Sequence, residues 1–200
     1  MAVKRWTVRP DFFLFPALLL LTGAWPLLPP LLLAALFHEL GHLLALGILG
    51  GRLLGVTLGL TGVSFQVDTR RLSYGGEALA ALTGPAFSLL LAVGAALLGR
   101  RWGSPWWYVL SGVSTALGLF NLLPVSVLDG GRCVFMLLQS FFGPAAARTV
   151  SGALDGALCG LLWVAGLLGC VRTDGNFSLL LAAASLTIFC CKRREKDVRL

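Results

Sequence analysis

The stretch PLLLAALFHELGHLLALGIL, residues 30–49, combines an apolar run of membrane-spanning length with a charged motif. At about 1.5 Å per residue, a helix over this stretch is about 30 Å long, which matches the hydrocarbon core of a bilayer. His38 and His42 are the only histidines in the 200-residue chain. Ionisable groups at membrane depth are costly and usually functional, so we expect the functional site on this helix.

The motif His38-Glu39-Leu40-Gly41-His42 has the spacing of a metal site. Residues four apart lie on the same face of an α-helix, so both imidazoles can bind one ion. His-Glu-x-x-His is the arrangement of zinc hydrolases, in which the glutamate acts as general base on an activated water. Because a catalytic zinc takes three protein ligands and an open position, one further ligand is required.

The composition is that of an integral membrane protein. Hydrophobic residues make up 57% of the chain and charged residues 12%, with a mean hydropathy of +0.86. A soluble domain has about twice this charged fraction. The net charge of +7 does not indicate nucleic-acid binding, since basic residues that flank spanning helices explain it. The five cysteines form no CxxC pair, and we expect them to be reduced and structural.

The expected fold class is an all-α polytopic membrane protein, with about six transmembrane helices and a short membrane-associated β-hairpin. Apolar runs predict the six spans: 12–28, 30–49, 77–98, 105–123, 152–171 and 177–191. A shorter helix is expected at 131–142. Residues 56–68 are rich in β-branched residues and predict the hairpin, which is either a surface connector or an exposed strand edge that pairs with an extended peptide.

The distribution of basic residues predicts the sidedness of the six spans. Both termini fall on one side, together with 13 of the 16 Lys and Arg residues; only Arg100, Arg101 and Arg172 fall on the other. By the positive-inside rule, both termini are cytoplasmic in a multi-pass protein of the cell membrane. A five-span alternative divides these charges less cleanly.

Asp129 is the strongest candidate for the third ligand. It lies between an apolar helix and Gly130-Gly131, after Pro124 has ended the helix. Most of the other carboxylates, a set that includes Asp155, are expected at span ends or in loops, where a charge costs little. The second and fourth spans both run toward the cytoplasm in this topology, so His42 and Asp129 are expected at similar depth.

These motifs resemble the site-2 protease family of intramembrane zinc metalloproteases (peptidase M50). The resemblance rests on His38 to His42, on Asn121-Leu122-Leu123-Pro124 and on Leu128 to Arg132, and it covers residues 30 to 142. It implies that Zn2+ is bound by His38, His42 and Asp129, that Glu39 is the catalytic base, and that Asn121 is a secondary polar residue. Thr83 to Ser88 resembles a Gly-Pro element of the family, which implies secondary or substrate-binding roles for Gly84, Pro85 and Ser88. Many members have Asn where Ser88 stands.

The resemblance extends most closely to the sporulation stage IV branch, which processes a sigma-factor precursor. It implies a membrane-associated protein substrate, a regulatory membrane partner and no nucleic acid. We expect one intramembrane metalloprotease domain over residues 1–200, with its core at 30–142 and without a PDZ or CBS domain.

Two other functions remain open from the residues. A metal-binding membrane transporter needs the same ligands but no general base, and it should have ligands at several depths, whereas one cluster is visible. A catalytically silent relative would bind membrane proteins without cleaving them. Intact Glu39 weighs against this second alternative.

Overall fold

A computed structural model describes residues 5–8, 21, 23–59, 62–68, 72–172 and 177–198. The chain forms two compact units, residues 1–121 and residues 122–200, and each is described by itself. The predicted first span, 12–28, lies largely outside the described residues.

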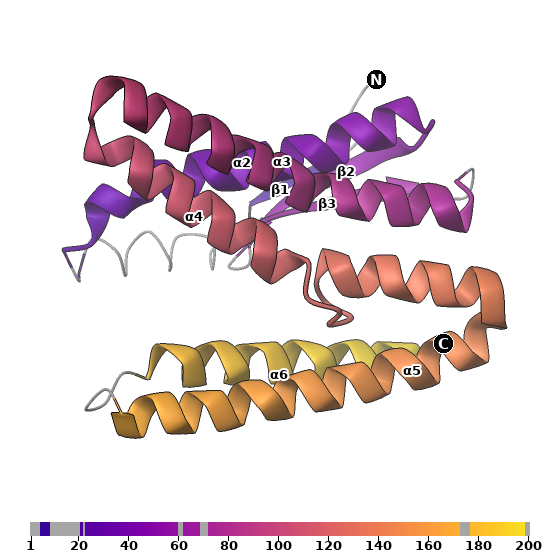
Figure 1. Cartoon of the computed structure of the whole chain (residues 1–200). Helices are drawn as coiled ribbons and strands as arrows, with labels where there is room; N and C mark the ends of the chain where they lie inside the picture. The colour runs from indigo at the N-terminus through magenta and orange to yellow at the C-terminus, as the bar shows by residue number, and fades with distance from the viewer. Residues whose placement is uncertain are drawn as a thin grey trace. The chain divides into compact units, whose positions relative to one another are not determined.

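The first unit is built around three helices, which Figure 1 shows in order along the chain. They are α2 (Leu28–Ile48), which follows the short 3-10 helix η2 (Trp25–Leu27), α3 (Tyr74–Trp102) and α4 (Pro105–Asn121). α3 packs against both of the other helices, and α2 also contacts α4. Small side chains allow this close approach: Ala34 of α2 and Ala95 of α3 meet the fully buried Leu110 of α4.

The ends of α3 follow from local chemistry. The hydroxyl of Ser73 caps its first turn by accepting a hydrogen bond from the Gly76 N–H at 3.1 Å. Gly103 ends the helix with a left-handed backbone, φ 67°, which a residue without Cβ adopts at no steric cost. Pro105 then begins α4, where its missing N–H is not needed. The helix that carries the Gly-Pro element is therefore defined at both ends.

A three-stranded sheet completes the first unit. Its strands are β1 (Arg5–Val8), β2 (Arg52–Gly59) and β3 (Gly62–Asp68), in the order β1-β2-β3. β2 and β3 are antiparallel, which confirms the predicted hairpin and extends it back to Arg52. Residues 60 and 61, which join the two strands, are not described. β1, which was not predicted, pairs with β2 in parallel.

The second unit consists of a loop and two long helices. Residues 122–128 lead into α5 (Asp129–Arg172), and α6 (Ser178–Val198) packs along α5. Gly143, with φ 82° and ψ 171°, interrupts α5 directly before Pro144. Figure 1 shows the helix turning back on itself at this point, so that α5 has two limbs, 129–142 and 144–172. The first limb contains the predicted short helix, and the second contains the predicted span 152–171.

The structure confirms a mostly helical, membrane-compatible chain. Three described helices are long and apolar enough to cross a membrane, at Trp25–Ile48, Tyr74–Trp102 and Asp129–Arg172. The predicted spans 105–123 and 177–191 correspond to α4 and to a shorter apolar stretch of α6, Leu179–Cys191. Six membrane crossings therefore remain a prediction.

Candidate metal centre

The two histidines lie one turn apart on the face of α2 that packs against α3. His38 is only 5% exposed, and His42 is partly buried. Their rings meet edge to face, with centroids 4.9 Å apart and planes at 80°. The i and i+4 spacing thus brings the two imidazoles together, as the sequence predicts.

Helix α3 supplies a hydrogen-bonding partner for the Nδ1 atom of each imidazole. The Ser88 hydroxyl lies 2.9 Å from Nδ1 of His38, and the Ala80 carbonyl lies 2.8 Å from Nδ1 of His42. Because a carbonyl oxygen only accepts, Nδ1 of His42 carries the proton and donates it. The Nε2 lone pair of His42 is then available to a metal ion, which is the usual arrangement of a metal-ligating histidine.

The separation of the two Nε2 atoms fits one tetrahedral zinc ion. They lie 3.3 Å apart. Two Zn–N bonds of about 2.0–2.1 Å at a tetrahedral angle place the nitrogens about 3.3–3.4 Å apart. When both Nε2 atoms bind a metal, the proton of the His38 ring must be on Nδ1. The Ser88 hydroxyl oxygen can then accept a hydrogen bond from this N–H group. The spacing of the histidine pair therefore fits a metal ion, and the contacts of both Nδ1 atoms are compatible with the tautomers that metal binding requires.

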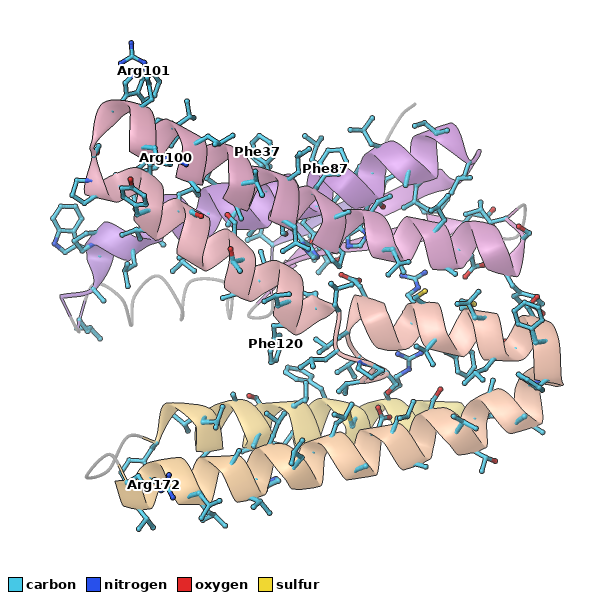
Figure 2. The ribbon with its side chains drawn as sticks, viewed as in Figure 1. Phe37, Phe87, Arg100, Arg101, Phe120 and Arg172 are labelled. Carbon is cyan, nitrogen blue, oxygen red and sulfur yellow. The ribbon has the colours of Figure 1, made fainter. Side chains whose placement is uncertain are left out.

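Two glycines allow α2 and α3 to approach closely at this level. A Cβ on Gly84 of α3 would overlap the imidazole of His42. A Cβ on Gly41 of α2 would lie 3.0 Å from Cβ of Phe87, a residue of α3 that is labelled in Figure 2. Gly84 therefore forms the backbone wall against which the His42 ring lies.

The other predicted residues of the first unit lie on the same three helices. Glu39 is partly buried on α2, beside His38. Pro85 is fully buried within α3, and its carbonyl faces Gly118 of α4. Asn121 ends α4, where its amide donates to the Leu117 carbonyl at 2.9 Å. Their catalytic or substrate-binding roles stay predictions.

Asp129 is the first residue of α5 in the second unit, and it is partly buried. A carboxylate in the first turn of a helix is stabilised by the unpaired N–H groups there. Gly130 and Gly131 lie directly against the carbonyls of Leu122 and Val125, so neither has space for a side chain. Among the described residues, the set of side chains suited to a metal ion is His38, His42 and Asp129, a composition consistent with Zn2+.

The sequence did not indicate two features of these units. Ser88 was expected to have a secondary or substrate-binding role, and the sequence did not indicate that its hydroxyl contacts His38. Its spacing of four residues from Gly84 was the available signal, because it places both on one face of α3. Asp155 lies near the start of the predicted span 152–171, and the sequence did not indicate that it binds Ser126 from within the second limb of α5.

Comparisons with known proteins find similarity to zinc metalloproteases. The family model for peptidase family M50 matches residues 99–162. Rip3 of Mycobacterium tuberculosis, which is named as a zinc metalloprotease, is 32% identical over 181 residues. Zinc metalloprotease MJ0392 of Methanocaldococcus jannaschii is 24% identical over 173 residues. The alignments cover 83% and 84% of this chain but 44% and 48% of those proteins, so the chain spans about half their length.

The fold also has a counterpart of known structure. The site-2 protease from Methanocaldococcus jannaschii superposes with a TM-score of 0.74, at 21% sequence identity, over 96% of this chain and 91% of that chain. At this level of identity the likeness concerns the fold. It extends across both compact units of the chain.

Proposed function

On the premise that this chain belongs to peptidase family M50, the site-2 protease family, we propose that it is an intramembrane zinc metalloprotease. This premise is supported by the family model, the sequence relatives and the fold. It would hydrolyse a peptide bond in or near the membrane segment of a membrane-associated protein. The observation that carries the proposal is the histidine pair, whose Nε2 atoms lie 3.3 Å apart while both Nδ1 atoms are engaged by α3.

We propose Asp129 as the third protein ligand. The need for a third ligand, the composition of the His-His-Asp set and the resemblance of its sequence motif support this role. The N-terminus of α5 also stabilises the ionised form of its carboxylate, which is the form that binds metal.

Glu39 would act as the general base and acid of the reaction. When bound, zinc would activate a water molecule and polarise the scissile carbonyl. Glu39 takes a proton from the attacking water and then donates it to the leaving amine. The substrate segment must be extended, because a helical segment engages its own carbonyls, and an edge of the β1-β2-β3 sheet is suited to hold such a segment.

We also propose finer assignments. Apolar runs and the distribution of basic residues support six spans with both termini in the cytoplasm. The resemblance supports one metalloprotease domain, and we propose a regulatory membrane partner that controls access to the site. A sigma-factor precursor is the substrate to test first, because the place of the His38–His42 motif in the second of six predicted spans is similar to that in the sporulation branch.

Co-expression with candidate membrane-associated precursors tests the proposal. We expect the wild type to cleave a precursor near its membrane segment, and Glu39→Gln to abolish cleavage while zinc stays bound, because the amide cannot accept the water's proton. Zinc content measured on the purified proteins is the control. Cleavage by the metal-replete Glu39→Gln protein would remove Glu39 from the mechanism. Absence of cleavage by the wild type across all candidates, with one zinc bound per chain, would favour the silent relative.

A further inference from the structure

A second carboxylate, Asp155, lies inside the apolar second limb of α5. Both of its oxygens bind one residue of the loop that precedes Asp129: Oδ1 accepts from the Ser126 N–H at 2.7 Å, and Oδ2 accepts from the Ser126 hydroxyl at 2.7 Å. We propose that Asp155 is a positioning residue, which holds the loop 122–128 so that Asp129 is correctly placed to bind zinc. This inference rests on the function proposed above.

The membrane setting makes this pair of hydrogen bonds notable. A carboxylate within an apolar helix is costly unless it is paired, and such residues usually have a function. Ser126 is itself buried, 8% exposed, and its N–H needs an acceptor. Asp155 supplies that acceptor.

Packing and a backbone hydrogen bond hold the loop around Ser126 and Asp129. Val125 is fully buried and packs in one cluster with Cys159 of α5 and Leu186 of α6. The Leu128 N–H donates to the Val125 carbonyl at 2.8 Å. Gly130 and Gly131 press against the loop backbone at the start of α5. A displacement at Ser126 is therefore transmitted to Asp129 instead of being absorbed between them.

The reversal at Gly143 brings Asp155 to the loop. The first limb of α5 leads away from Asp129, and the second limb returns past the loop. Asp155 and Cys159 lie one turn apart on this second limb, and they meet Ser126 and Val125 respectively. One face of α5 thus holds the loop by a polar and an apolar contact.

Metal binding by the purified full-length chain tests this role. The probes are Zn2+ affinity, measured by competition with a chelator, and the visible spectrum of the Co2+-loaded protein, which reports the ligand set. Loss of a group that orients a metal ligand typically costs about 10–100-fold in metal affinity. We expect a loss of this size and an altered Co2+ spectrum for Asp155→Ala. Ser126→Ala should give a smaller loss, because the N–H bond to Asp155 remains.

The Asp155→Asn variant distinguishes the effect of the hydrogen bonds to Ser126 from the effect of the negative charge. Its carboxamide oxygen can accept from the Ser126 N–H, and its NH2 group can donate to the Ser126 hydroxyl. We expect it to keep the Co2+ spectrum and most of the affinity. Ser151→Ala is the matched control: Ser151 lies one turn earlier on the same face of α5, and its buried hydroxyl has no hydrogen-bond partner in the part of the chain that the structure describes. It should bind metal like the wild type.

Wild-type affinity and spectrum in a folded Asp155→Ala protein would overturn the proposal. If Asp155→Ala does not fold, Ser126→Ala decides, and an unchanged affinity and spectrum in that variant would overturn the proposal equally. Failure of the wild type to bind Zn2+ or Co2+ is a different result, because it would overturn the proposed metalloprotease function itself.

Discussion

At the scale of the residue, Ser88 controls the orientation of His38. Its buried hydroxyl lies 2.9 Å from Nδ1, and the ring has no freedom to turn without losing that contact. We expect Ser88→Ala to weaken Zn2+ binding about 10–100-fold, as loss of a histidine's outer partner typically does. Equilibrium competition with a chelator measures this. Thr115→Ala is the control, since the Thr115 hydroxyl donates to the Ser111 carbonyl of its own helix at 2.8 Å.

The contact between Gly84 and His42 gives a second prediction at this scale. A methyl group at Gly84 would overlap the imidazole, so Gly84→Ala should displace His42 and reduce the zinc content of the purified protein. Gly94→Ala, on the same helix, adds its methyl group in open space and should leave zinc binding unchanged. Equal zinc content in the two variants would contradict the packing described for Gly84.

Residue spacing predicts the histidine pair but not its surroundings. Two histidines four apart on a helix must share a face, and the structure places their rings together. The partners Ser88 and Ala80 come from a helix about 40–50 residues further along the chain. Which residues of α3 face α2 depends on how the two helices pack, and no local pattern contains that information.

At the scale of the element, the reversal within α5 depends on Gly143. Its φ of 82° with ψ of 171° lies in a region that is essentially open only to glycine, at a cost of about 1–3 kcal/mol for other residues. Gly143→Ala should therefore lower the thermal midpoint of the purified protein. Gly160→Ala, in the helical second limb with open space around it, should keep or raise the midpoint, because alanine is about 1 kcal/mol the better helix former.

Element prediction succeeded where the signal is local. Apolar runs give the helices, and β-branched residues give the hairpin of β2 and β3. Strand β1 was missed because its parallel partner lies about 50 residues away, from Arg5 opposite Gly55 to Val8 opposite Leu58. The contact between Asp155 and Ser126 was not predicted because the two residues lie 29 positions apart in the sequence.

At the scale of the whole molecule, the distribution of Lys and Arg residues predicts a membrane topology that fused reporter proteins can test. Arg100 and Arg101 lie at the end of α3, close to the start of α4 (Figure 2). If both termini are cytoplasmic, alkaline phosphatase inserted between Gly103 and Ser104 should be active, and the same enzyme fused to the C-terminus should be inactive. A cytoplasmic fluorescent reporter should give the opposite pattern. Activity at both sites would favour an odd number of spans.

The sequence predicts the class and family of the whole molecule, but not the number of its membrane crossings. Composition predicts a membrane protein, and the motifs with their order along the chain predict the family that the comparisons support. Three described helices have clear spanning length, while α4, with 17 residues, falls just short. The number of crossings depends on lipid thickness and tilt as well as on helix length, so the helices alone do not determine it.

The contact between His38 and Ser88 also has a consequence for biosynthesis. The ribosome completes α2 some 40 residues before it reaches Ser88, so the helix emerges with its two imidazoles lacking the partners that α3 supplies. Polar groups of this kind disfavour release into lipid. Helix α2 should therefore remain at the insertion machinery until α3 arrives, and the two should enter the bilayer as a pair. We therefore expect the residues of the proposed metal centre also to influence when α2 leaves the insertion machinery.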